Sequence, residues 1–154
     1  MARQNSLVET TTMMTTPKTT YIICATPRSG SSLLCESLSN TFLAGQPEEY
    51  FGKKSEYIWR TKWQLSSSEA YFRWLIDHGT SSNGVFGVKI MWEQMDYCIQ
   101  FLRGLPQYHS SMMSPPGLLP RVFPNLSYIW ITRRDKVRQA VSSRHHNPNR
   151  TLRI

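Results

Sequence analysis

The chain has 154 residues, of which 40 % are hydrophobic, so it is long enough to bury a core, yet it has no apolar run long enough to cross a membrane. The net charge of +8 raises the question of nucleic-acid binding. However, seven lysines and arginines against one aspartate lie in residues 133–154, without the interleaved aromatic residues that stack on bases. We therefore expect no membrane association and no specific nucleic-acid partner, although a polyanion could adhere nonspecifically.

The amino-terminal segment, residues 1–20, is polar and threonine-rich, which predicts a disordered arm rather than a signal peptide. Three cysteines without C-x-x-C spacing are typical of free thiols in a reducing compartment. Four histidines without zinc-ligand spacing predict no metal site. Together these features favour a cytoplasmic protein.

The first predicted strand is the apolar run of residues 21–25, whose length and composition are typical of a strand covered on both faces. A helix follows, with Leu33, Leu34 and Leu38 at helical spacing. Ser31 or Ser32 would serve as its N-cap. The pattern predicts a strand, a short turn and a helix.

The turn between them carries the strongest functional signal of the chain. Gly30 allows a close approach of the backbone to a ligand, and one arginine lies just before it. Backbone N–H groups, hydroxyls and a guanidinium at the positive end of a helix would hold a phosphate or sulfate group, here by Arg28, Ser29, Gly30, Ser31 and Ser32. An ordinary capped turn with a surface arginine is the alternative. A nucleotide-hydrolysing P-loop is excluded, because the turn lacks its second glycine and its lysine.

The middle of the chain predicts helices over residues 66–79 and 95–102, a strand over residues 85–90 and a loop over residues 110–117. Lys89 lies near the carboxyl end of this strand, where side chains of parallel sheets face the ligand crevice. The alternative is a lysine that extends along the edge of the sheet.

A second strand-to-helix unit follows at residues 126–142. A buried strand over residues 126–132 precedes Arg133, and Ser142 lies on the helix that follows. Arg133 and Ser142 could converge on a second phosphate, unless they belong to a solvated basic surface. Two anion sites at the carboxyl ends of buried strands predict an open α/β sheet that binds a nucleotide. Residues 143–154 have neither helical nor strand spacing.

Four separate blocks of the sequence resemble, in the same order, the bacterial trehalose 2-sulfotransferase family. They are T-P-R-S-G-S-S-L-L-C-E-S-L at residues 26–38, A-G-Q-P-E-E-Y-F at residues 44–51, G-V-F-G-V-K-I-M-W at residues 84–92 and R-R-D-K-V-R-Q-A-V-S at residues 133–142. The resemblance implies an α/β, P-loop-like sulfotransferase fold with a parallel sheet, of which this chain holds the amino-terminal portion. The expected organisation is an arm over residues 1–20, a partial sulfotransferase domain over residues 20–143 and an unmatched basic tail over residues 144–154.

The resemblance also implies a function. Members transfer a sulfuryl group from 3′-phosphoadenosine 5′-phosphosulfate to a hydroxyl of a carbohydrate such as trehalose, and a full-length chain could form a homodimer. Arginines and backbone amides can stabilise such a transfer without a metal.

The resemblance assigns roles to particular residues. Residues 28–32 would hold the 5′-phosphosulfate, with Arg28 also taking part in catalysis, while Arg133 and Ser142 would hold the 3′-phosphate. Glu49 would be the general base, with a solvent-exposed loop carboxylate as the alternative. Gln46, Glu49 and Lys89 would face the acceptor. Gln46 stands where the family has a glutamate, so the identity of the acceptor stays open.

Two other functional classes are compatible with the sequence. One is a nucleotide-binding remnant that lacks catalysis, and the other is a basic nucleic-acid adaptor.

Overall fold

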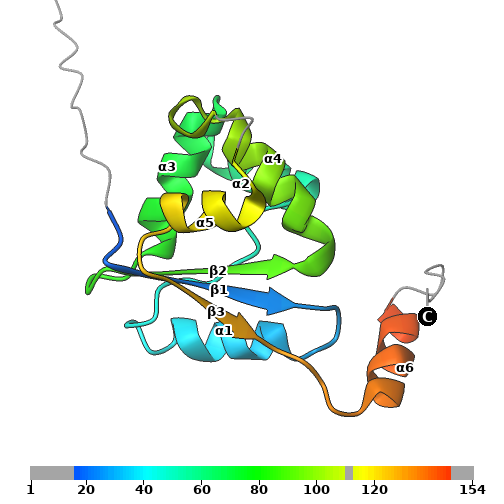
Figure 1. The fold of residues 1–154 in the computed structure, drawn as a ribbon. Helices are drawn as coiled ribbons and strands as arrows, with labels where there is room; N and C mark the ends of the chain where they lie inside the picture. Colours follow the sequence, from blue (N-terminus) through cyan, green and yellow to red (C-terminus); the bar gives the residue numbers. More distant parts are fainter. Residues whose placement is uncertain (1–15, 110–112, 147–154) are drawn as a thin grey trace, which may run out of the picture.

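The fold is known from a computed structural model, which describes residues 16–109 and 113–146. Its centre is a three-stranded parallel sheet in the order β2–β1–β3, built from β1 (Thr19–Ala25), β2 (Val85–Met91) and β3 (Leu126–Trp130) (Figure 1). Ile22 of the central strand lies opposite Val88 on one side and Tyr128 on the other. The predicted α/β class with a parallel sheet is confirmed.

Helices cover both faces of this sheet. In Figure 1, α1 lies against one face, α3, α4 and α5 lie against the other, and α6 stands beyond the carboxyl end of β3. None of the helices in the described part of the chain is long and apolar enough to span a membrane. The helices are α1 (Ser31–Ser39), α2 (Lys53–Trp63), α3 (Ser68–Gly79), α4 (Met95–Gly104), α5 (Pro115–Val122) and α6 (Lys136–His146), with the short 3-10 helices η1 (Trp92–Gln94) and η2 (Pro106–Tyr108).

The core has two parts because side chains of β1 alternate between the faces of the sheet. Ile22 packs on the larger side with residues of α3, α4 and α5, such as Leu75, Leu102 and Leu119. Tyr21 and Ile23 point to the other face and pack with Cys35 of α1. The cysteines of the described chain are free, and burial raises the pKa of the Cys35 thiol to about 11.

The ends of the described chain differ from the sequence-based expectation. β1 begins at Thr19, inside the range expected to be a disordered arm, and the buried Thr20 donates a hydrogen bond from Oγ1 to Pro124 O at 2.7 Å. At the other end, α6 continues through Arg144 to His146, where neither helix nor strand was expected. The rest of the predicted arm and of the basic tail, residues 1–15 and 147–154, lies outside the described residues.

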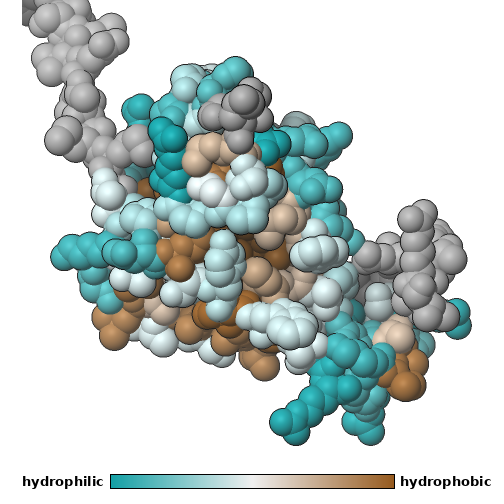
Figure 2. Space-filling model, viewed as in Figure 1, coloured by the Kyte–Doolittle hydropathy of each residue, from teal (hydrophilic) through white to brown (hydrophobic). Residues whose placement is uncertain are grey.

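Two further predictions need correction. A loop was expected over residues 110–117. Residues 110–112 lie outside the described residues, and Pro115 begins α5. Prolines are tolerated in the first turn of a helix, where the N–H group has no intrahelical partner. β3 was expected to be buried, yet within the described part of the chain it is an edge strand, with Tyr128 53 % and Trp130 79 % exposed. Figure 2 shows hydrophobic residues at the surface over α1 and β3, and the exposed hydrophobic side chains of these two elements include Leu33 and Ile129.

We expect the Gly45→Ala variant to be less stable than the wild type by about 2 to 4 kcal/mol. Gly45 has φ of 74°, and an added Cβ would lie only 2.5 Å from Gly79 O and 2.8 Å from Val85 O, both backbone atoms that cannot move aside. Urea unfolding measures the difference. Gly104→Ala is the matched control, because nothing lies within 4 Å of an added Cβ there. Equal stability of the two variants would contradict the close packing of Gly45 against β2.

Candidate functional site

The turn between β1 and α1 presents backbone N–H groups that have no side-chain cap. Gly30 is the N-cap residue of α1, with φ of 94° and no side-chain cap hydrogen bond. This corrects the expected N-cap at Ser31 or Ser32, which lie inside the helix instead. Arg28 also has a positive φ, 61°, which turns the chain sharply before the helix begins. The first N–H groups of a helix without a side-chain cap can bind an anion.

Side chains from two strand ends meet at this turn. Arg28 and Arg133 line one cavity of about 210 Å³, together with Gly30, Ser31 and Ser32. Both arginines also line an adjoining cavity of about 550 Å³, which is bounded by residues of α6, including Ser142, Arg138 and His145. The guanidinium groups of both arginines are positively charged and line the same cavity, so the potential inside the cavity is positive.

Helix α6 is attached to the turn by hydrogen bonds. Nε of Arg28 donates to Oγ of Ser142 at 2.8 Å. Nε2 of Gln139 donates to Pro27 O at 2.8 Å and to Oγ1 of Thr26 at 3.1 Å. Ser142 is therefore beside Arg28, as well as near Arg133 across the larger cavity. Gln139 was not singled out by the sequence, because nothing in its local pattern shows a contact more than 100 residues away.

Ser29 differs from its neighbours in the turn. It does not line the cavity that holds Ser31 and Ser32. Its Oγ is buried and has no hydrogen-bond partner among the described residues. The structure therefore does not bring Ser29 to the cavity that Arg28, Ser31 and Ser32 line.

A buried lysine joins the turn to the loop that precedes α2. Nζ of Lys89 lies 2.9 Å from Oε1 of Glu49 and 3.3 Å from Oγ of Ser32. Only 8 % of the Lys89 side chain is exposed, against 37 % of the Glu49 side chain. Lys89 thus points toward the candidate site rather than along the sheet edge. The described geometry places the Glu49 carboxylate near the candidate anion-binding turn, with one oxygen paired to the Lys89 cation.

Backbone hydrogen bonds hold the Glu49 loop against β2 and against the end of α3. Lys89 N donates to Glu48 O at 3.0 Å, and Gln46 N donates to Gly79 O at 3.0 Å. The hydroxyl of Tyr50 donates to Gln46 O at 2.6 Å, and burial raises the pKa of that hydroxyl. Gln46 and Glu49 therefore lie on one loop of fixed backbone.

Aromatic rings of α2 and α3 pack against Tyr50, which belongs to this loop. Tyr50 packs against Trp59 and Trp74, and the Trp74 ring stacks on His78 with a centroid distance of 4.7 Å. Nζ of Lys62 lies 5.2 Å from the centre of the Trp59 ring. Burial, and then the charge of Lys62, lower the pKa of His78. We name these rings, Tyr50, Trp59, Trp74 and His78, the aromatic cluster.

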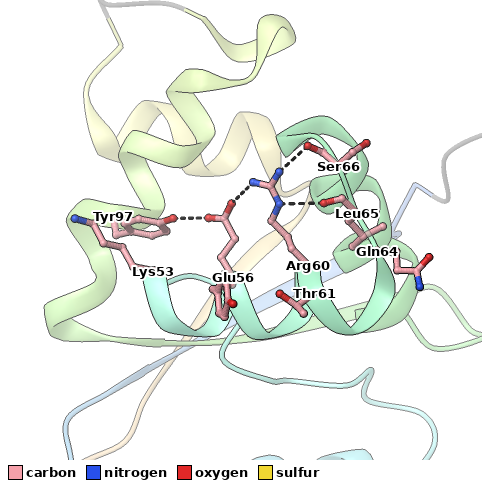
Figure 3. A pocket seen from close by; sticks show the side chains of 9 residues that line it. Lys53, Glu56, Arg60, Thr61, Gln64, Leu65, Ser66 and Tyr97 are labelled. Carbon is pink, nitrogen blue, oxygen red and sulfur yellow. Dashed lines mark hydrogen bonds and ion pairs between the residues drawn. The ribbon is translucent and has the colours of Figure 1, made fainter.

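A separate cavity of about 530 Å³ lies between α2 and α4, and Figure 3 shows its polar side chains. The carboxylate of the buried Glu56 pairs with Arg60 at 2.9 Å and accepts a hydrogen bond from the hydroxyl of Tyr97. Arg60 also donates to Leu65 O and Ser66 O. Because the buried carboxylate and the arginine are both paired, we interpret this cluster as a structural contact between α2 and its neighbours.

Comparison with known proteins identifies the family. Residues 20–153 match the Stf0 sulphotransferase family. The chain belongs to that family. The match extends past residue 143, where the resemblance was expected to end.

Two curated relatives agree with this assignment. The chain is 31 % identical over 156 residues to the trehalose 2-sulfotransferase of Mycolicibacterium smegmatis, with 80 % of this chain and 55 % of the relative covered. It is 29 % identical over 154 residues to the trehalose 2-sulfotransferase of Mycobacterium tuberculosis, with 79 % and 54 % covered. The chain therefore spans about half the length of the curated relatives it matches. The predicted family is confirmed.

Across residues 16–109 and 113–146, no group of three or more histidine, cysteine, aspartate or glutamate side chains is arranged to hold a metal ion.

The aromatic cluster predicts a pH dependence of stability. His78 has a lowered pKa in the folded protein, so the unfolded chain binds a proton more readily. Neutral His78 makes its full contribution to the free energy of unfolding above the pKa of histidine in the unfolded chain, about 6.5. Below that pH the free energy of unfolding falls by at most about 1.4 kcal/mol per pH unit. Urea unfolding at pH 7.5 and pH 5.5 measures this, and the His78→Phe variant should lose less stability between the two. The exposed His109 supplies the control, His109→Phe. An unchanged loss in the His78 variant would contradict the account.

Proposed function

We propose that the chain binds 3′-phosphoadenosine 5′-phosphosulfate and uses it to transfer a sulfuryl group to a hydroxyl of a carbohydrate. The observation that carries this proposal is the cavity shared by Arg28 and Arg133, which follow two neighbouring parallel strands and meet at the first turn of α1. A ligand with negative charge at both ends fits such a pair of cationic positions.

The residues of the turn suit the sulfated end of the donor. The first N–H groups of α1 and the hydroxyls of Ser31 and Ser32 are donors at the positive end of a helix dipole. Arg28 uses Nε for its bond to Ser142, and its two terminal nitrogens carry four further N–H donors. Arg133 and Ser142 would hold the 3′-phosphate, since both line the larger cavity that adjoins the turn.

Glu49 is the proposed general base. An alcohol is a weak nucleophile at neutral pH, and a carboxylate within hydrogen-bond reach can accept its proton as the new bond to sulfur forms. The donor supplies the sulfuryl group. Lys89, which contacts both Glu49 and Ser32, would keep the carboxylate and the donor turn at a constant separation. Arg28 would balance negative charge that develops on the leaving phosphate oxygen.

The proposed acceptor class is a carbohydrate, because both curated relatives are trehalose 2-sulfotransferases. Gln46 lies on the Glu49 loop and is half-buried, and we propose that it helps to select the acceptor.

A nucleotide-binding protein without catalysis is the second candidate. The pairing of Glu49 with Lys89 favours it, because Oε1 of that carboxylate is already in contact with a cation. Binding of the donor without transfer to any sugar would select this candidate.

We expect Arg28→Ala and Arg133→Ala each to weaken binding of 3′-phosphoadenosine 5′-phosphate by roughly 10- to 100-fold, since each removes charge-assisted hydrogen bonds to a phosphate. Isothermal titration calorimetry measures the affinities. The exposed neighbour Arg134 provides the control, and Arg134→Ala should change the affinity by less than about threefold. An equal loss in all three variants would indicate nonspecific attraction and contradict the shared site.

We expect Glu49→Gln to lower the rate of transfer by roughly 10²- to 10⁴-fold while binding of 3′-phosphoadenosine 5′-phosphate stays within about twofold. Glutamine has nearly the same shape but cannot accept the proton. Transfer of ³⁵S from labelled donor to a panel of sugars, trehalose included, gives the rate. Glu48→Gln, at the exposed neighbouring position, is the matched control. Full activity of Glu49→Gln would exclude Glu49 as the base.

A further inference from the structure

Gln94 contacts the carboxylate that is proposed to act as the base. It is the last residue of η1, the short helix that follows β2. Its Nε2 donates a hydrogen bond to Oε2 of Glu49 at 3.3 Å. Its Oε1 accepts a hydrogen bond from Met91 N at 3.3 Å, at the end of the strand. Both ends of the amide are thus engaged, so its orientation is defined.

The two oxygens of Glu49 are held by different donors. Lys89 pairs with Oε1 and Gln94 donates to Oε2, and both of these residues are anchored to the carboxyl end of β2. Contacts on both oxygens restrict rotation of the carboxylate about its last bond. Because the Gln94 amide is neutral, it orients the carboxylate without adding a second positive charge next to a group that must accept a proton.

The backbone leaves room for the Gln94 side chain. Gly52, three residues after Glu49, has φ of 149°, and a Cβ added there would lie 3.2 Å from Nε2 of Gln94. A contact this short would force the amide to shift. Glycine at this position therefore allows the loop that carries Glu49 to pass close to the amide that holds it.

We propose that Gln94 is a positioning residue, which holds the Glu49 carboxylate in the orientation needed for proton transfer. This inference rests on the proposed function, in which Glu49 is the base. Gln94 acts through Glu49 and has no direct role in binding the donor. Correct placement of a catalytic group contributes strongly to rate, so loss of the contact should lower kcat more than it changes KM.

Two variants separate positioning from a structural role. Gln94→Glu keeps an oxygen that can accept from Met91 N but replaces the donor to Glu49 with a carboxylate. Gln94→Met has a similar length and removes both contacts. We expect both variants to lower kcat by roughly 10- to 100-fold, with KM for the donor and the affinity for 3′-phosphoadenosine 5′-phosphate within about twofold of the wild type. The exposed Gln100 of α4 gives the control for the added charge, Gln100→Glu, which should keep wild-type activity.

The outcomes distinguish this inference from the proposed function. Wild-type kcat in Gln94→Glu, with a loss in Gln94→Met alone, would show that Gln94 only supports the turn after β2 and would overturn the inference. Absence of transfer by the wild-type chain would overturn the proposed function instead.

A second measurement tests the Gln94 contact without catalysis. Urea unfolding of Glu49→Ala, Gln94→Met and the double variant forms a double-mutant cycle. We expect the double variant to lose less stability than the sum of the two single losses, because either substitution alone already removes the bond. Additive losses would overturn the inference whether or not the chain transfers sulfuryl groups.

Discussion

The parallel pairing of β1 with β3 is the constraint on which the candidate site depends. Cys24 lies opposite Trp130, and Ile131 N donates to Cys24 O at 3.1 Å, so the two strands end together at one edge of the sheet. The chain leaves both strands at this edge, which is where open α/β sheets bind their ligands. Arg28 and Arg133, 105 positions apart in the sequence, reach one cavity for this reason.

The central place of β1 in the sheet gives its turn two different neighbours. On the β3 side, Arg133 and Ser142 supply cationic and hydroxyl groups that suit a phosphate. On the β2 side, Lys89 brings Glu49 to the turn through its contacts with that carboxylate and with Ser32. Strand order β2–β1–β3 thus separates the proposed anion-binding groups from the proposed base, and Lys89 links the base to the same turn. In-line transfer needs a donor site beside an acceptor site, and the cationic groups on one side of the turn and the carboxylate on the other agree with this requirement.

Local patterns predicted the parts of the site that depend on adjacent residues. A strand, a glycine and a helix in immediate succession place backbone and side-chain donors at one turn, which is why the sequence indicated residues 28–32. Of these, Arg28, Gly30, Ser31 and Ser32 line the cavity and Ser29 does not. The exposure of β3 could not be found in this way, because a run of β-branched and aromatic residues has the same pattern in a central strand and an edge strand. Gln94 and Gln139 were missed, since their partners lie 45 and more than 100 positions away and depend on how β2 and α6 pack.

The crystal structure of this chain with 3′-phosphoadenosine 5′-phosphate bound tests the central claim most directly. The account predicts one ligand molecule in contact with both strand ends. Its 5′-phosphate should lie on the backbone N–H groups of Ser31 and Ser32 beside Arg28, and its 3′-phosphate should lie on Arg133 and Ser142. A ligand that contacts only one of the two arginines, or that binds on another face of the sheet, would contradict the account.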